Sequence, residues 1–270
     1  MQPCTFYSQR GNAADAAAFA LLGGRLDAAS CTFAKTLRCP CDPSSIGRGT
    51  FLEIGARDGV GGSNSLFFER HAGWSGFCVE AKRQHFEKLR RNRPSCWTYF
   101  GTVTNALPHG ANATFVRSRT PPPANSGWSF FRRGSVPQEE WNKIKSRGRR
   151  LRDVREVMKI LHWSNLFRSR RVRTVDFASV DVEGAEEAVL RTVNFRAVAV
   201  RVLVVERPTV AVRALLRDAG MAAVGEYSSA LGDVMFARND LLAALSADER
   251  ARRLALVRRL ATPFDAARAH

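Results

Sequence analysis

The sequence lacks long apolar runs. No stretch of about 20 apolar residues occurs among its 270 residues, which argues against a membrane-spanning helix. The apolar residues 16–22 follow Asp15, and no convincing cleavage pattern comes after them, so we predict no signal peptide. We expect a soluble protein and favour the cytoplasm, while export stays open.

Lysine is also scarce. It supplies six of the 42 basic residues and arginine supplies the rest, so that against 25 acidic residues the formal net charge is +17. Such a surface attracts anionic partners, among them nucleic acid, an anionic glycan or a membrane surface. A solvated basic surface without any partner is the commoner origin of such an excess.

Cysteine and histidine spacings typical of metal sites are absent. Cys39-Pro-Cys41 is not a C-x-x-C motif and no histidine stands near it, so we expect no zinc site and no other metal. Cys78 falls in a predicted buried strand, which favours a free thiol in the core. Disulfides among Cys4, Cys31, Cys39 and Cys41 are an alternative if the protein is exported, and the sequence leaves their pairing open.

The stretch Phe51-Leu-Glu-Ile-Gly-Ala-Arg-Asp-Gly59 predicts a short buried strand followed by a glycine turn. Residues 63–70 then predict a helix that opens on a polar cap. The dinucleotide fingerprint G-x-G-x-x-G fails here, because Asn64 stands where its last glycine belongs. Acid-x-Gly-x-x-x-Gly is instead typical of the first motif of S-adenosylmethionine (SAM) methyltransferases.

Alternating strand and helix patterns predict an α/β fold with a parallel sheet. The expected strands are 51–54, 76–80, 98–104, 113–117, 175–180 and 198–205, followed by an antiparallel pair at 222–226 and 234–238. Residues 1–50 are expected to form a helix and a Cys/Pro loop that pack on the core. Residues 51–240 are expected to form the main domain, and residues 241–270 a basic amphipathic helix.

A basic insertion or lid is expected at about 118–173, with helices at 139–147 and 153–167. It contains Trp128, Trp141 and Trp163. Aromatic and arginine side chains suit a groove for sugars or nucleic acid, and we predict that this segment forms an acceptor wall. The alternative is that its aromatic residues pack the insertion onto the body of the protein.

Four acids stand at the carboxyl ends of predicted strands, namely Glu53, Glu80, Asp181 and Glu206. Ligands of open parallel sheets bind over that edge, and carboxylates there are costly unless they have partners. Glu80 follows Gly55 by 25 residues, where an acid reaches a ribose diol.

Together these motifs resemble the FkbM family of SAM-dependent methyltransferases. The resemblance implies a doubly wound, Rossmann-like sheet of seven strands with the last antiparallel and helices on both faces. It also implies O-methylation of a hydroxyl on a sugar or another small metabolite. It runs in order from Tyr7 to Arg238 through Tyr7-Ser-Gln9, the glycine turn, Ser63-Asn64, Gly73-Trp-Ser-Gly-Phe-Cys-Val-Glu80, Asp176-Phe-Ala-Ser-Val-Asp-Val-Glu-Gly-Ala-Glu186, Val204-Val-Glu206 and Gly232-Asp-Val-Met-Phe-Ala-Arg238.

The same resemblance implies where SAM would bind. The floor under its methionine part would consist of Glu53, Gly55, Ala56 and Gly59. Glu80 would hold the ribose hydroxyls, Asn105 would lie near the adenine, and Asp181 would face the sulfonium. Further cofactor contacts are expected from Ser63, Asn64 and Ala81.

Two features depart from the family pattern, which has Asp-x-Gly-Ala-Asn in the first motif and an acidic stretch in the N-terminal block. Glu53 and Arg57 stand in the first motif, and Arg57 beside a sulfonium is unfavourable unless it points outward or pairs with Asp58. After Gln9 the usual acidic stretch is replaced by Gly11-Asn12-Ala13.

For the chemistry we predict Asp181 on the cofactor side and Glu183 as the base or orienting group for the acceptor hydroxyl. The alternative for Glu183 is a structural role, in which it only caps the following helix. Two other functions stay open: a nucleic-acid methyltransferase or RNA/DNA-binding protein that uses the basic surface, and a non-catalytic SAM-fold interaction module.

Overall fold

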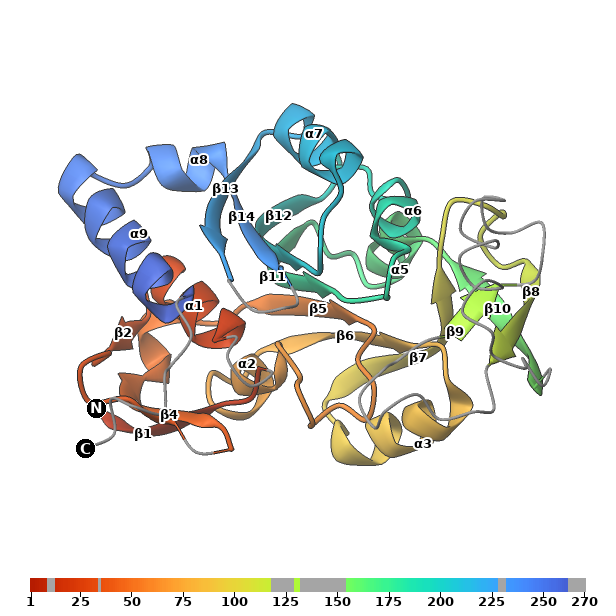
Figure 1. Ribbon diagram of the computed structural model, residues 1–270, viewed down its shortest axis with the longest axis horizontal. Coiled ribbons are helices and arrows are strands. Elements are labelled where there is room, and N and C mark those ends of the chain that lie inside the picture. Colours follow the sequence, from red (N-terminus) through yellow and green to blue (C-terminus); the bar gives the residue numbers. More distant parts are fainter. Residues whose placement is uncertain (9–12, 34, 118–128, 132–153, 228–231, 262–270) are drawn as a thin grey trace.

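The computed structural model describes residues 1–8, 13–33, 35–117, 129–131, 154–227 and 232–261. Its central feature is a sheet with the strand order β13-β14-β12-β11-β5-β6-β7-β10-β8-β9 (Figure 1). The strands are β5 (Thr50–Ile54), β6 (Ser75–Glu80), β7 (Cys96–Val103), β8 (Asn112–Arg117), β9 (Ser129–Phe131), β10 (Val154–Leu161), β11 (Thr174–Val180), β12 (Ala199–Val205), β13 (Met221–Glu226) and β14 (Val234–Arg238).

Seven strands, from β13 to β7, form the doubly wound core that the sequence predicts. β5 pairs in parallel with β6 and β11, β6 with β7, and β11 with β12. β14 is antiparallel to β12 and β13, so the predicted fold class is confirmed. The number of strands differs from the expected seven. β10 pairs in parallel with β7, β8 pairs antiparallel with β10, and β9 pairs antiparallel with β8, so the described sheet has ten strands.

The predicted helix at 153–167 is wrong, because residues 154–161 form β10 and the helix begins only at Trp163. Met158 and Ile160 are buried while Val157 and Lys159 are exposed, which is the period of a strand. Trp163 is fully buried and packs on Phe167, so it belongs to the core and not to an acceptor groove.

Most of the predicted acceptor wall lies outside the described residues. This applies to its expected helix at 139–147, to Trp128 and to Trp141.

Helices cover both faces of the sheet, as expected (Figure 1). In β12 the side chains of Val202 and Val204 join one core, whereas Leu203 and Val205 join the other. The first core lies under α1, α2, α3 and α9, the second under α5, α6 and α7. The helices are α1 (Ala14–Leu21), α2 (Leu66–Arg70), α3 (Arg83–Asn92), α5 (Trp163–Ser169), α6 (Glu186–Leu190), α7 (Val210–Asp218), α8 (Asn239–Ala243) and α9 (Ala247–Ala261).

The N-terminal region forms a small sheet of its own, where the sequence predicts only a loop after the first helix. Its strands are β1 (Gln2–Phe6), β2 (Arg25–Leu26), β3 (Thr32–Phe33) and β4 (Leu37–Asp42), followed by a 3₁₀ turn at Pro43–Ile46. The expected C-terminal helix is divided into α8 and α9, because Ser246 caps a new helix by accepting from Glu249 N. No helix in the described ranges is both long and apolar enough to cross a membrane.

All six cysteines are paired in disulfides. Cys4 joins Cys41 and Cys31 joins Cys39 within the N-terminal region. Cys78 joins Cys96, so the prediction of a free Cys78 thiol is wrong. The reason is the register: Gly76 lies opposite Cys96, which brings Cys78 of β6 one diagonal step from Cys96 of β7 on the neighbouring strand.

Replacing Cys4 and Cys41 together by serine should lower the free energy of unfolding by about 3–4 kcal/mol. The bond closes a loop with a sequence separation of 37 residues, and opening it frees the unfolded chain. Urea unfolding measures the change. Alkylation of the unfolded but unreduced wild-type protein should label none of the six cysteines, and labelling of Cys78 under these conditions would contradict the β6–β7 disulfide.

Candidate active site

The carboxyl ends of β5, β11 and β12 are tied to one another by backbone hydrogen bonds beyond the strands. Asp181 N donates to Ile54 O and Glu206 N donates to Val180 O, each at 3.0 Å. On the other side of β5, Gly55 N and Ala56 N both donate to Val79 O, at 3.0 and 3.1 Å. The acids that follow these strands are therefore held on a backbone framework at one edge of the sheet.

Gly55 is required by a close backbone approach. Its φ is +89°, and a Cβ atom there would lie 1.8 Å from the carbonyl oxygen of Asp181. No side chain fits that distance, so glycine allows the turn after β5 to pass directly over the end of β11.

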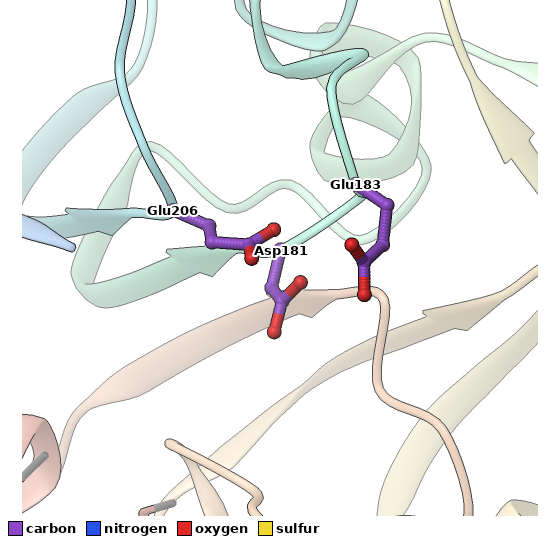
Figure 2. A group of neighbouring side chains, drawn as sticks. All are labelled: Asp181, Glu183 and Glu206. Atoms are coloured by element: carbon purple, nitrogen blue, oxygen red, sulfur yellow. The ribbon is translucent and has the colours of Figure 1, made fainter. Parts of the chain in front are cut away.

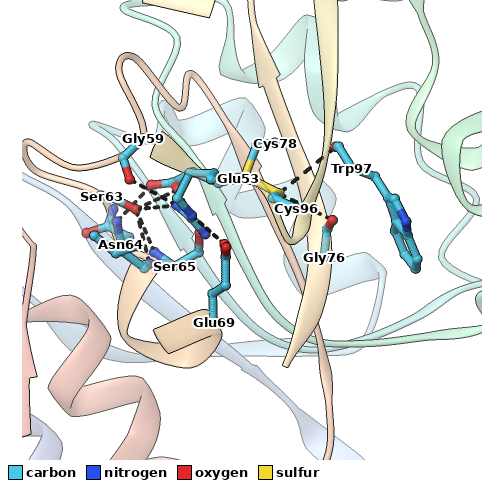
Figure 3. The surroundings of a disulfide bond; sticks show 12 residues. Glu53, Gly59, Ser63, Asn64, Ser65, Glu69, Gly76, Cys78, Cys96 and Trp97 are labelled. Carbon is cyan, nitrogen blue, oxygen red and sulfur yellow. Dashed lines mark hydrogen bonds and ion pairs between the residues drawn. A yellow bond between two sulfur atoms is a disulfide. The ribbon is translucent and has the colours of Figure 1, made fainter. Parts of the chain in front are cut away.

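Glu53 is buried beneath the glycine turn, and both of its oxygens have partners. Ser63 Oγ and Ser65 Oγ donate to one oxygen at 2.8 and 2.7 Å, and Asn64 N donates to the other at 2.7 Å (Figure 3). The carboxylate thus anchors the loop that leads into α2. Its expected contact with the methionine part of SAM stays a prediction.

Arg93 is the cation that makes this buried carboxylate tolerable. Its side chain is 0% exposed and forms ion pairs with Glu53 and Glu69. It also donates to the hydroxyls of Ser63 and Ser65, at 3.1 and 3.0 Å, and to the carbonyl of Gly59. Sequence reasoning missed this residue, because it stands at the end of a basic helix whose other arginines read as solvated.

Glu80 lies at the end of β6 and is buried. Its two oxygens accept from the backbone N–H groups of Arg57 and Lys82, at 2.8 and 2.7 Å. Burial raises the pKa of this carboxyl, and the two backbone donors partly offset that effect. Each carboxylate oxygen has a further lone pair, so the fixed carboxylate can still accept from two neighbouring hydroxyls.

The Arg57 side chain is exposed, so it can point outward, which is one of the two conditions under which an arginine is tolerated beside a sulfonium. Its φ of +50° turns the chain so that its N–H reaches Glu80.

Three carboxylates gather where β11 and β12 end. One oxygen from each of Asp181, Glu183 and Glu206 lies within 4.8 Å of the others (Figure 2). Arg207 donates to Glu183 at 2.9 Å and forms an ion pair with Glu206 at 2.7 Å. Glu183 and Arg207 both have positive φ, +59° and +41°, so both strand ends turn sharply here.

Burial is the main reason that the pKa of Glu206 rises to about 9, and the charge of Asp181 adds to it. Burial likewise raises the pKa of Asp181. Glu206 was recognised in the sequence as a strand-end acid but was given no role, and Arg207 was missed. Both follow directly on the apolar strand β12, which is the signal that could have found them.

Glu186 holds the turn after β11 by accepting from Val182 N and Gly184 N, at 3.2 and 3.0 Å. Helix α6 has no side-chain hydrogen bond at its N-cap, so the capping considered for Glu183 is not observed.

The remaining predicted site residues are spread along this edge. Asn64 donates to Ser179 Oγ at 2.9 Å, which ties the α2 loop to β11. Asn105 is exposed and its N–H donates to Ala188 O of α6. Ala56 is buried in the glycine turn, and Ala81 is half-buried after Glu80. Cofactor contact at each of these residues stays a prediction.

The family model described as "Methyltransferase FkbM domain" matches residues 53–221. This chain belongs to the FkbM methyltransferase family. The match confirms the family expected from the motifs, and with it SAM as the cofactor of this FkbM-family chain. No curated protein matches the sequence.

Among solved structures, a methyltransferase FkbM from Methylobacillus flagellatus KT is 10% identical with a TM-score of 0.41, covering 70% of this chain and 43% of that one. This chain thus spans less than half of that protein. A precorrin-6y C5,15-methyltransferase from Geobacter metallireducens GS-15 is 12% identical with a TM-score of 0.32, covering 71% and 82%. Aeropyrum pernix fibrillarin, crystallised with natively bound SAM, is 11% identical with a TM-score of 0.35, covering 79% and 81%. The family assignment rests on the sequence match and not on these distant likenesses.

Gly55→Ala should destabilise the protein by more than about 2 kcal/mol, because both positive φ and the contact with the Asp181 carbonyl oppose a Cβ atom. The matched control is Gly73→Ala, which has φ +65° but nothing within 4 Å of its Cβ position. The Gly73→Ala variant therefore has the backbone strain of a positive φ without a steric clash. Thermal or urea unfolding of both variants compares them, and equal losses would mean that the close approach is not real.

Arg93→Met should cost about 3–5 kcal/mol of folding free energy, because it leaves Glu53 and Glu69 buried without their cation. Arg90→Met is the control, since the Arg90 side chain is 66% exposed. Its loss should stay within about 0.5 kcal/mol. Chemical denaturation measures the free energy of unfolding of both variants. A small loss in Arg93→Met would show that the network under the glycine turn contributes little to stability.

Proposed function

We propose that this chain is a SAM-dependent O-methyltransferase acting on a hydroxyl of a sugar or another small metabolite. The observation that supports it is the placement of acids along one sheet edge. Glu80 ends β6 on one side of β5, and Asp181 and Glu206 follow β11 and β12 on the other. The glycine turn after β5 passes between them.

The residues at this edge suit the chemistry of SAM. The ribose diol needs two acceptors, and Glu80 offers one free lone pair on each of its fixed oxygens. The sulfonium and ammonium groups are cationic, and the carboxylates of Asp181 and Glu183 provide a negative field beside the turn. When bound, SAM supplies an activated methyl group for an in-line displacement.

The protein's own contribution is alignment, exclusion of water and removal of the hydroxyl proton. The Glu183 side chain is 27% exposed, so an acceptor can reach it, and Arg207 holds its carboxylate in place. We assign Glu183 to the acceptor hydroxyl. The backbone of Asp181 lies directly against the Gly55 turn, and we assign this residue to the cofactor side.

The six paired cysteines bear on the compartment. Disulfides persist in oxidising surroundings and are rare in the cytosol. We therefore propose an oxidising compartment in place of the cytoplasm favoured from the sequence, and alkylation of the protein in lysates of its native source tests this.

Glu80→Ala should weaken SAM binding by about 1.5–3 kcal/mol, the scale of charge-assisted hydrogen bonds. Isothermal titration calorimetry with SAM and S-adenosylhomocysteine measures it. Glu87→Ala, on the half-exposed face of α3, is the control and should bind as the wild type does. Unchanged affinity in Glu80→Ala would refute the ribose assignment, and no binding by the wild type at millimolar SAM would refute the proposed function.

Labelled SAM incubated with a mixed panel of glycans, small hydroxylated metabolites and RNA should label a hydroxylated small acceptor. With that acceptor, Glu183→Gln should keep SAM affinity and lower kcat by about 10²–10⁴-fold, the usual range for losing a general base. Asp181→Asn should reduce SAM binding and turnover together. Labelling of RNA alone would favour the nucleic-acid enzyme, and SAM binding without any transfer would favour a non-catalytic module.

A further inference from the structure

We propose that Asp181, Glu183 and Glu206 form a binding site for a hard divalent cation of the Mg²⁺, Mn²⁺ or Ca²⁺ class. One oxygen from each residue lies within 4.8 Å of the others. Ligand oxygens on opposite sides of a cation are about 4.0–4.2 Å apart for Mg²⁺ and about 4.6–5.2 Å apart for Ca²⁺, since the bonds are about 2.0–2.1 and 2.3–2.6 Å long. The 4.8 Å limit lies within the span of Ca²⁺, and the smaller Mg²⁺ would draw the three oxygens slightly closer together.

An independent feature of Glu206 points to a missing partner. Its side chain is only 7% exposed, and its buried Oε2 atom receives no hydrogen bond from an N–H or hydroxyl donor in the described chain, so that a proton shared with the Asp181 carboxyl is the alternative to an ion. Figure 2 shows this carboxylate reaching toward Asp181, with Glu183 on the other side of Asp181. A buried carboxylate oxygen without a donor is costly, and a cation between these groups removes that cost.

Arg207 does not balance the cluster by itself. One guanidinium nitrogen, Nη2, contacts both Glu183 and Glu206, so a single guanidinium faces three carboxyl groups. The Arg207 side chain is 48% exposed and can move outward into water when an ion enters. An all-carboxylate ligand set selects hard cations over zinc or copper, which prefer nitrogen and sulfur.

The sequence suggested no metal because these residues are not arranged as a recognised motif. β11 and β12 are adjacent parallel strands whose ends coincide, so Val180 lies opposite Val205 and the acids that follow them meet.

The consequence for catalysis, though not the binding itself, rests on the proposed function. A cation here would stand at the acceptor side of the sheet edge and favour loss of the hydroxyl proton. Glu183 would then act as a ligand as well as an orienting group. Because Asp181 belongs both to the ion site and to the cofactor side, ion affinity is measured without SAM, and SAM affinity is measured without the ion.

The test titrates the chelator-treated full-length chain with Mn²⁺ alone, followed by electron paramagnetic resonance, and with Ca²⁺ or Mg²⁺ by calorimetry. We expect saturable binding of one ion. Loss of even an outer-shell partner typically costs about 10–100-fold in affinity, so Glu206→Gln and Asp181→Asn should each weaken binding by at least that factor. Glu187→Gln, whose carboxylate pairs with Arg191 on α6, should bind as the wild type does.

Arg207→Met provides a test with the opposite sign. Removing the competing guanidinium should tighten cation binding, whereas Arg213→Met, which loses only the ion pair with Glu226, should not change it. Circular dichroism and thermal unfolding show that each variant is folded. No saturable Mn²⁺ binding by the wild type at millimolar concentration, equal affinity in Glu206→Gln, or weaker binding in Arg207→Met would overturn the site, and a shared proton would then be the partner of Glu206.

SAM binding with methyl transfer that is independent of cations would leave the proposed function intact and refute the catalytic role of the ion. Cation binding by a chain that binds no SAM would support the ion site and refute the proposed function.

Discussion

The contact between the Gly55 backbone and the Asp181 carbonyl is the constraint on which the site depends. A Cβ atom at residue 55 would lie 1.8 Å from that oxygen, so the two strand ends are packed as closely as backbone allows. Asp181 N in turn donates to Ile54 O. This approach decides that the acids following β11 stand directly beside the glycine turn, where a ligand of the sheet edge would lie.

Such a tight turn needs support from below, and a buried ion network provides it. Glu53 accepts hydrogen bonds from the loop residues Ser63, Asn64 and Ser65. Arg93 forms an ion pair with that carboxylate and donates to the Gly59 carbonyl. Buried ion pairs seldom stabilise a fold more than apolar residues would, but they specify one arrangement. The polar network under the turn therefore serves mainly to fix the geometry of the edge above it.

The electrostatics of the edge run against those of the whole chain. The formal net charge is +17, yet Glu80, Asp181, Glu183 and Glu206 concentrate negative charge over a few strand ends. Burial opposes this concentration and raises the pKa of Glu80 and Glu206. A site that keeps such carboxylates together suits positively charged ligands, both the sulfonium of SAM and a divalent cation.

The sequence by itself determined the strands of the core, the glycine turn, the strand-end acids and the family, because local periodicity and motif spacing are properties of neighbouring residues. It did not reveal the β10 strand, the Cys78–Cys96 bond, the buried Arg93 or the Glu206–Arg207 pair. Each of these depends on which strands lie side by side and in what register. Asp181 and Glu206 are 25 residues apart in the chain and meet only because β11 and β12 are parallel neighbours. Local pattern does not contain that information, and tertiary pairing alone decides it.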